Sequence, residues 1–546
     1  MIDFRLVSCM EKVFPDAEPG RLEYAPEGLI GEETAFQAAW KASPDEFAKW
    51  LVNIRVESPI AEYIRIYKVQ NVPVELAWFV CDDPDYLRTT PGLYPDALVP
   101  VPEGGLRLYS VIWQAAYFSI CPPDELPAGT YPITVILESD SGAELGRAGT
   151  VYTRVAAALP EQRLIHTRWF HNDGLCQYYH VEMFSEEYWR ICENFVRAAA
   201  DMSVNCLLTP VHTPPLDTRV GGERLTCQLV DIRADHGKYT FGFDKLQRWI
   251  AMAKRCGIRY FEIAHFFTQW GAAHAPKIVA ETPEGTRRIF GWETDATGEE
   301  YAGFLKAYIP ALRAELDRLG VLDHCLFHIS DEPNKEQLPS YLAAKALVAD
   351  ALKGLTIIDA LSNIEFYSSG AVEHPVPATN AIKPFLEAKV PGLWTYYCCG
   401  QFDRVSNCFI AMPLARERMI GVQLYKYDIA GFLQWGFNFY NCQFSMHPVD
   451  PWLTTDGEGF TQAGDCFIVY PGKNGEAVPT LRSKTFAQAV NDIRALQKLE
   501  EYIGKDEVMK LVEEGIDPIE FDSYPRGEKY LWELRRKVNA KIRSFL

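Results

Sequence analysis

The chain has 546 residues, 48% of them hydrophobic and 23% charged, which indicates two or three ordinary globular domains. Its formal net charge of −19 argues against nucleic acid as a partner, because a phosphate backbone requires clustered Lys and Arg. No segment is long and apolar enough to cross a bilayer, so we expect no membrane partner.

Residues 1–158 show the pattern of strands. The stretches AAYFSI (115–120) and GTYPITVILES (129–139) are apolar or alternating, and the second lies between a Gly and a polar turn. We predict an N-terminal β-sandwich domain that braces the rest of the chain and is a candidate for a dimer contact in a homo-oligomer. The segment LPEQRL (159–164) is the predicted linker.

From residue 164 onwards, strands alternate with amphipathic helices. The expected strands are IHTRWF (165–170), NCLLTP (205–210), RYFEIA (259–264), CLFHIS (325–330), LTIIDA (355–360), LWTYYC (393–398), GFLQWG (431–436) and CFIVYP (466–471). Most are unbroken apolar runs, as in a parallel sheet covered on both faces. Eight strand–helix units predict an α/β fold, a (β/α)₈ TIM barrel over residues 159–500, with a C-terminal helical extension at 501–546. The doubly wound fold is disfavoured because no Gly-rich phosphate turn follows the first strand.

The carboxyl ends of the strands build the active site of such a barrel. We therefore expect the polar and aromatic side chains at these ends to contact the substrate. They are Trp169, Asp173, His212, His265, Asn363, Glu365, Trp394, Tyr396, Trp435 and Asn438. Aromatic rings that face sugar rings, with polar groups that bind hydroxyls, are typical of a carbohydrate site, although aromatic strand ends are also common in cores. The predicted partner is an oligosaccharide or glycoconjugate.

The fourth expected strand ends in the motif HISDEPN, with the adjacent carboxylates Asp331 and Glu332 before Pro333. A Glu at this place is a common position for the general acid of a glycosidase barrel, and hydrolysis usually requires a second carboxylate. The stretch GFLQWGFNFYN, the seventh expected strand, contains no acid where the commonest retaining barrels carry their nucleophile. The expected protein nucleophile is therefore missing.

Two alternatives supply the missing group. Glu365 could act as the second carboxylate, or a 2-acetamido sugar could use its own carbonyl oxygen while Asp331 orients the amide. Neighbours on a regular strand face opposite sides, so both acids enter one site only if the chain bulges at 331–332. The same residues also fit a helix start, with Ser330 or Asp331 as the N-cap and Pro333 in the first turn.

HISDEP, followed by WTYYCCG, GFLQWGFN, DCFIVYPG and LRS, resembles glycoside hydrolase family 123 and its uncharacterised relatives over about residues 160–500. The resemblance implies a β-N-acetylhexosaminidase, in particular a β-N-acetylgalactosaminidase, with substrate-assisted retaining catalysis and no metal. By matching motif, Glu332 would be the catalytic general acid/base and Asp331 the catalytic residue that orients the acetamido group. Trp394, Tyr396, Trp435 and Asn438 fall on recurrent motif positions. The family's sandwich domain ahead of the barrel also agrees with residues 1–158.

Other chemistry has weaker support. No cofactor is expected, and a zinc site of His166, His171, His265 and His274 has no helical ligand spacing. The 14 scattered cysteines and the absence of a signal pattern in residues 1–20 favour a cytoplasmic protein. A carbohydrate-binding protein without catalysis remains the alternative from another functional class.

Overall fold

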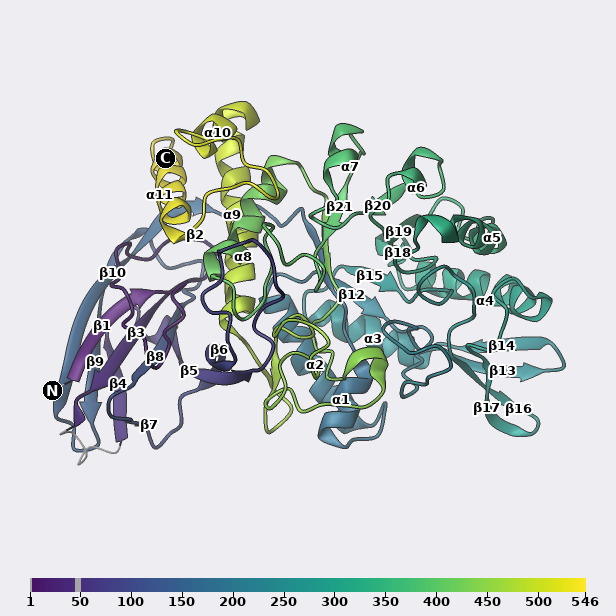
Figure 1. The fold of residues 1–546 in the computed structure, drawn as a ribbon, viewed down its shortest axis with the longest axis horizontal. Helices are drawn as coiled ribbons and strands as arrows, with labels where there is room; N and C mark the ends of the chain where they lie inside the picture. The colour runs from purple at the N-terminus through teal and green to yellow at the C-terminus, as the bar shows by residue number, and fades with distance from the viewer. Residues whose placement is uncertain (1, 45–50) are drawn as a thin grey trace.

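The computed structural model describes residues 2–44 and 51–546, so residues 1 and 45–50 of the predicted N-terminal domain lie outside the described residues. A β-sandwich forms one end of the molecule and a barrel of strands and helices forms the other (Figure 1). The C-terminal helices, yellow in Figure 1, lie beside the sandwich. In the described part of the chain, no helix is long and apolar enough to span a membrane.

The sandwich consists of two five-stranded sheets. One sheet has the order β1 (Ile2–Ser8), β3 (Thr34–Ala42), β8 (Trp113–Ile120), β5 (Ile64–Val74) and β6 (Gly92–Pro100). The other has the order β2 (Glu27–Ile30), β10 (Glu144–Ala158), β9 (Gly129–Ser139), β4 (Leu51–Glu57) and β7 (Leu106–Arg107). Alternating apolar residues of the two sheets form one buried core: Phe36 and Phe118 stack at 4.8 Å, and Val135 and Leu137 of β9 belong to the same cluster.

The barrel is a nearly closed sheet of eight parallel strands, which makes the whole a mixed α/β fold. In spatial order the strands are β20 (His374–Val376), β19 (Thr356–Ala360), β18 (Cys325–Phe327), β15 (Tyr260–Ile263), β12 (Cys206–Thr209), β11 (Ile165–Arg168), β22 (Gly431–Gln434) and β21 (Trp394–Tyr396). Tyr396 joins the two ends of this sheet: its N–H donates to the Pro377 carbonyl over 3.1 Å, and its own carbonyl accepts from the Thr379 N–H over 2.9 Å.

Helices follow each barrel strand and surround the sheet (Figure 1). They are α1 (Asn172–Tyr179), α2 (Glu186–Asp201), α3 (Asp244–Arg255), α4 (Glu299–Arg318), α5 (Leu338–Val348), α6 (Glu365–Ser368), α7 (Lys383–Glu387), α8 (Leu414–Lys426) and α9 (Leu481–Ile503), with α10 (Lys505–Val512) and α11 (Glu528–Arg543) at the C-terminus. Local signals start two of the long ones: Ser185 caps α2 and accepts the Tyr188 N–H, while Thr480 and Ser483 form a capping box on α9.

The strand count of the sequence prediction is wrong at two places. The sixth barrel strand is β20, a three-residue strand with a central proline that is too short to show a periodic pattern. The stretch 466–471 instead ends in β23 (Tyr470–Pro471), which pairs with β24 (Ala477–Val478) in a separate hairpin. The strand at 394–396 is therefore the seventh of the barrel, and the strand at 431–434 is the eighth.

A four-stranded sheet is inserted into the barrel and projects from it at the far end from the sandwich (Figure 1). It consists of β14 (Lys238–Gly242), β13 (Asp231–Asp235), β16 (Ile278–Thr282) and β17 (Gly285–Phe290). Two loops carry it, one between β12 and α3 and the other between β15 and α4. These insertions account for the length of the chain between the barrel strands.

Arg482 of α9 joins the sandwich to the barrel. Its guanidinium donates to both carboxylate oxygens of Asp96 on β6, over 2.8 and 2.9 Å, and both side chains are fully buried. The neighbouring Leu98 N–H donates to the Pro479 carbonyl over 2.8 Å. A buried ion pair that is completed by backbone hydrogen bonds holds the two parts in one relative orientation.

Candidate active site

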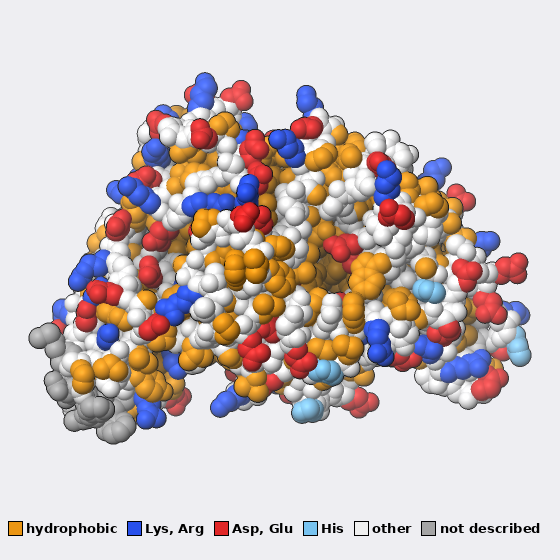
Figure 2. All heavy atoms as spheres, viewed as in Figure 1, with side chains coloured by type: hydrophobic (Ala, Val, Ile, Leu, Met, Phe, Trp, Pro, Cys, Tyr) orange, Lys and Arg blue, Asp and Glu red, His pale blue; other side chains and the backbone are white. Residues whose placement is uncertain are grey.

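A cavity of about 300 Å³ opens at the carboxyl ends of the barrel strands. In Figure 2 the surface over the barrel is hollowed, with hydrophobic side chains inside the hollow and acidic ones at its edge. Among the residues that the structure describes, the carboxylates that line the cavity are Asp217, Asp331 and Glu332. The other lining residues are Trp169, Leu216, Gln269, Trp270, Ala360, Tyr396, Cys398, Cys399, Leu433, Trp435, Gln443, Phe444 and Phe460.

Asp331 and Glu332 both line this cavity because the backbone turns sharply between them. Glu332 has a φ of 41°, in the left-handed region that side chains other than glycine rarely adopt. Backbone hydrogen bonds hold this turn: the Glu332 N–H donates to the Ala360 carbonyl over 3.1 Å, and the Asp331 carbonyl accepts from the Trp270 N–H over 2.9 Å. The strained turn breaks the strand alternation that would point the two acids in opposite directions.

The competing interpretation of this segment as a helix start is wrong. The cap belongs to Asn334, whose side chain accepts the Gln337 N–H at the start of a short 3₁₀ turn (Lys335–Gln337) ahead of α5. Ser330 instead donates its hydroxyl to the Thr268 carbonyl over 2.8 Å. Neither Asp331 nor Glu332 therefore caps this helical turn.

The two acids have different surroundings. Asp331 is half-buried, and burial, with the negative charge of Glu332 as the second cause, raises its pKa well above the ordinary value of 3.8. Glu332 is more exposed, and its Oε1 accepts a hydrogen bond of 2.6 Å from the Tyr396 hydroxyl. Burial thus makes the Asp331 carboxylate a stronger base than an ordinary one, while the Tyr396 hydroxyl orients Glu332.

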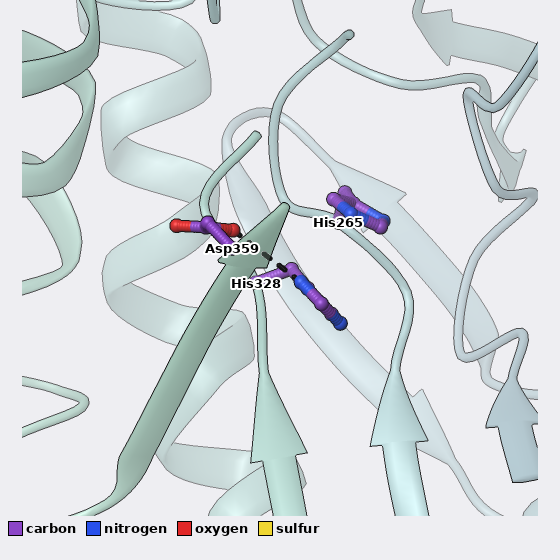
Figure 3. A group of neighbouring side chains, drawn as sticks. All are labelled: His265, His328 and Asp359. Atoms are coloured by element: carbon purple, nitrogen blue, oxygen red, sulfur yellow. Dashed lines mark hydrogen bonds and ion pairs between the residues drawn. The ribbon is translucent and has the colours of Figure 1, made fainter. Parts of the chain in front are cut away.

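A buried network of charges lies on the chain just before the two acids. His328 is fully buried between two carboxylates, with Nε2 2.7 Å from Glu262 Oε1. Its Nδ1 lies 3.3 Å from Asp359 Oδ1, the contact drawn in Figure 3. Burial alone would lower the pKa of His328, but hydrogen bonds to Asp359 and Glu262 outweigh it and raise the pKa to about 9. His328 is therefore an imidazolium at neutral pH.

The same network connects to the cavity wall and to the acidic turn. Glu262 Oε1 also accepts the indole N–H of Trp169 over 2.7 Å, and Trp169 lines the cavity. Asp359 Oδ1 also accepts the Ile329 N–H over 3.0 Å, two residues before Asp331. Fully satisfied buried networks of this kind rigidify what they contact, so the imidazolium fixes one wall and the backbone that leads to the acids.

Two groups of histidines are candidates for a metal site here: His265 and His328 with Asp359, and the set of His166, His171, His265 and His274. Neither has the geometry of a metal site. The rings of His265 and His328 stack face to face, 4.1 Å apart and 22° from parallel (Figure 3). Nitrogen lone pairs lie in the ring planes, so two stacked rings cannot direct them at one ion, and both His328 nitrogens already face carboxylates. In the histidine set whose spacing already disfavoured zinc, His166 Nδ1 faces the Ser203 carbonyl and His171 Nε2 faces the Trp435 carbonyl.

The structure brings together part of the predicted site. The predicted residues that line the cavity are Trp169, Asp331, Glu332, Tyr396 and Trp435. Trp435 is held by Asp465, whose Oδ2 accepts its indole N–H over 2.8 Å. Burial raises the pKa of Asp465 to about 7.

The other predicted residues have different neighbours. Asp173, His212, His265, Asn363, Glu365, Trp394 and Asn438 do not line the cavity. Asp173 forms a buried ion pair with Arg224, whose guanidinium nitrogen lies 2.6 Å from Oδ1. Glu365 lies on the surface in α6 and pairs with Lys335 over 2.8 Å.

The remaining five predicted residues contact other protein groups outside the cavity lining. His212 Nε2 faces the His265 carbonyl over 2.7 Å, and Asn438 Oδ1 accepts the His171 N–H over 2.8 Å. Trp394 is buried inside the barrel, where it packs so closely on Gly431 that any side chain there would collide with the indole. His265 stacks on His328 as described above, and Asn363 Oδ1 accepts the Glu365 N–H over 2.9 Å.

Residues of long loops complete the cavity, and strand ends alone do not reveal them. Asp217 is the clearest case: it lies in the loop after β12, and burial raises its pKa to about 6. Its Oδ2 accepts the Phe444 N–H over 3.0 Å, which joins two loops that are far apart in sequence. Gln269 and Trp270 follow β15 in the same way. The weak signal for Asp217 was the stretch LLTPVHTPPLDT, whose acid lies nine residues beyond Leu208 of the strand.

A (β/α)₈ barrel with acids and aromatic rings at the carboxyl ends of its strands has the architecture of a glycoside hydrolase. The family model described as "Glycoside hydrolase 123, catalytic domain" matches residues 169–499. The chain therefore belongs to glycoside hydrolase family 123. Membership of this family supports glycosidase activity in general.

One solved structure of the same family agrees on the fold. A family 123 glycoside hydrolase from Clostridium perfringens, solved in a study of glycolipid glycan hydrolysis, superposes with a TM-score of 0.73 and covers 100% of this chain and 98% of its own. At 12% identity this similarity concerns the fold alone. A β-glucuronidase from Parabacteroides merdae matches with 10% identity, 90% and 52% coverage and a TM-score of 0.32, which is too low to support an inference. No curated protein sequence matches the chain.

Proposed function

We propose that this glycosidase hydrolyses β-linked N-acetylhexosaminides, in particular N-acetylgalactosaminides, with retention and with the substrate's acetamido group as the nucleophile. The observation that carries the proposal is the turn at Glu332, which directs two consecutive carboxylates into one cavity. The corrected seventh and eighth strands, β21 and β22, both end without an acid, so the usual place of a protein nucleophile holds none.

In the first step Glu332 donates its proton to the glycosidic oxygen, and the bond from that oxygen to the anomeric carbon breaks. The acetamido carbonyl oxygen bonds to the anomeric carbon, and Asp331 accepts the amide N–H. A raised pKa suits Asp331 to take up that proton as the oxazoline ring forms. In the second step Glu332 removes a proton from water, which attacks the anomeric carbon. The bond from that carbon to the acetamido oxygen breaks, and Asp331 returns its proton to the nitrogen, with overall retention.

The walls of the cavity suit a sugar with an apolar face. Trp169, Trp270, Tyr396 and Trp435 line it, and Gln269 supplies an amide. Because the related C. perfringens enzyme was studied for glycolipid glycan hydrolysis, the glycan of a glycoconjugate is the substrate class that we propose. We propose cytoplasmic action on such glycans or on their fragments.

A set of aryl glycosides with one leaving group tests the proposal. The β-N-acetylgalactosaminide is expected to turn over fastest, the β-N-acetylglucosaminide more slowly, and the plain β-galactoside not measurably. A thiazoline mimic of the cyclised intermediate is expected to inhibit competitively. Preferred cleavage of the plain galactoside would refute the acetamido mechanism, and glycan binding without any turnover would indicate a binding protein.

A hydrolase with two protein carboxylates is the second candidate. Glu365 is a poor partner for Glu332, because it lies outside the cavity and pairs with Lys335. Asp217 favours this candidate instead, since it lines the same cavity and burial raises its pKa to about 6. A 2-fluoro glycoside that labels Asp217 covalently, read by peptide mass spectrometry, would support this mechanism over the proposed one.

A further inference from the structure

A second cluster of potential ligand atoms lies at the rim of the cavity. Cys442, His447 and Glu458 each offer one such atom, and these three atoms lie within 4.8 Å of one another. Cys442 is 3% exposed, whereas the side chains of His447 and Glu458 are 52% and 51% exposed. The cluster therefore has one donor anchored in the protein and two that solvent can reach.

The backbone brings these residues together without help from their side chains. The Cys442 N–H donates to the His447 carbonyl over 3.1 Å, and Asn441 bridges to Pro448, so Cys442 and His447 lie at the base of one closed loop. Glu458 comes from the next loop, in a left-handed conformation with a φ of 64°. The donor set is thus preorganised by two separate segments.

The two ring nitrogens of His447 face different oxygen atoms. Its Nδ1 lies 3.3 Å from the Pro448 carbonyl, which only accepts hydrogen bonds. Its Nε2 lies 3.2 Å from Glu458 Oε2. A histidine whose other nitrogen donates to a backbone carbonyl is the usual arrangement of a metal ligand.

We propose that Cys442, His447 and Glu458 bind one Zn²⁺ ion, with water in the fourth position. Thiolate, imidazole and carboxylate are the ligands that zinc accepts together, and the two anions neutralise its charge. Zn–N and Zn–O bonds of about 2.0–2.1 Å at the tetrahedral angle separate the two ligand atoms by roughly 3.3 Å. The 3.2 Å between His447 and Glu458 agrees with that separation.

The ion acts on the shape of the cavity rim. Gln443 and Phe444, which line the cavity, directly follow Cys442, and Phe460 lies two residues after Glu458. Phe444 and Ser445 have φ values of 59° and 51°, so this segment is strained and requires support from its surroundings. Zinc joins the two rim segments and holds the Phe444 N–H against Asp217, which faces the cavity.

Metal binding by the full-length, chelator-treated protein tests the site independently of any activity. Calorimetric titration with Zn²⁺ is expected to show one ion per chain, and Zn²⁺ is expected to raise Tm. Co²⁺ as a spectroscopic probe should show a thiolate charge-transfer band and the d–d bands of four-coordinate cobalt. His447→Gln and Glu458→Gln, both at half-exposed positions that leave the fold intact, are expected to weaken Zn²⁺ binding by more than about tenfold.

His236→Gln, at a 93% exposed histidine outside the cluster, is the matched control and should bind Zn²⁺ like the parent. Cys442→Ser should remove the charge-transfer band. The proposal is overturned if the parent binds no zinc, if His447→Gln and Glu458→Gln bind it as tightly as the control, or if the cobalt spectrum lacks a thiolate band. Since activity is not the readout, these results are independent of the proposed glycosidase mechanism.

Discussion

The hydroxyl of Tyr396 donates a hydrogen bond of 2.6 Å to Oε1 of Glu332. Tyr396 ends β21 and Glu332 follows β18, so this contact connects two strands that are not neighbours in the barrel. Burial, with the charge of Glu332 as the second cause, raises the pKa of Tyr396 well above 10, so the hydroxyl keeps its proton. It is a permanent donor that fixes one carboxylate rotamer.

Replacement of Tyr396 by Phe is expected to lower kcat/KM by about twofold to tenfold, because Glu332 is neutral when it acts as the acid and a hydrogen bond between neutral groups contributes about 0.5–1.5 kcal/mol. Tyr131→Phe, which removes a hydroxyl bonded to the Pro127 carbonyl in the sandwich, is the matched control and should leave kcat/KM unchanged. Equal rates for the two variants would show that Glu332 needs no orienting donor.

The loss of hydrolysis rate in Glu332→Gln is expected to depend on the leaving group of the substrate. Removal of a general acid slows glycosides of basic alcohols by about a hundredfold or more, and slows aryl glycosides with acidic phenols less. Rates across a series of aryl leaving groups measure the difference. Glu336→Gln, at an exposed acid nearby, should behave like the parent across the whole series. A uniform loss in Glu332→Gln would argue against an acid role.

Asp331→Asn is expected to reduce turnover of the N-acetylated substrate by about a hundredfold or more. The reason is that an asparagine side chain, unlike a carboxylate, cannot take up the proton of the substrate's acetamido group. Affinity for the thiazoline mimic should fall in parallel, as measured by its inhibition constant. Unaffected thiazoline binding in this variant, with unchanged turnover, would remove Asp331 from the mechanism.

His328 should make stability depend on pH. Its pKa is about 9 in the folded protein and about 6.5 in an unfolded chain, so its contribution is complete below pH 6.5 and is lost as pH rises through 9. The full contribution is on the order of 3 kcal/mol. The free energy of unfolding, measured by denaturant titration at pH 6, 7.5 and 9, should therefore decrease with pH in the parent.

His328→Gln should abolish that difference and lower the free energy of unfolding at pH 6 by about 3–5 kcal/mol, since it leaves two buried carboxylates without a cation. His236→Gln, on the surface, should retain the pH dependence of the parent. A parent and a His328→Gln protein with the same slope would mean that His328 is neutral in the fold.

The buried pair of Arg482 and Asp96 should determine whether the sandwich and the barrel unfold together. Among the described residues, Arg482 is the only cation that forms an ion pair with the fully buried Asp96 carboxylate. Arg482→Leu removes this partner and should lower the free energy of unfolding by about 3–5 kcal/mol. Calorimetry should then show two transitions in place of one. Arg55→Leu, at a half-exposed pair in the sandwich, is the control and should change little. One unshifted transition in Arg482→Leu would contradict the coupling.

Much of the fold is readable in local patterns. Apolar runs separated by amphipathic helices predict a parallel barrel, since burial on both faces excludes polar residues from the strands. The motif HISDEP locates the acidic pair for the same reason: it ends a strand, and the carboxyl ends of parallel strands meet at one side of the barrel. The strand that the sequence prediction missed is β20. Its three residues, one of them a proline, form a strand only by pairing with neighbouring strands and show no periodicity of their own.

Tertiary contacts decided which strand-end residues reach the cavity. Asp173 and Glu365 are acids near strand ends, yet they pair with Arg224 and Lys335 outside the cavity. Asp217 enters the cavity because a loop more than two hundred residues away in sequence donates a backbone N–H to it. A one-dimensional pattern records which groups are polar and at what spacing. Partners and the left-handed turn at Glu332 depend on contacts between distant segments, so they emerge only when the whole chain is packed.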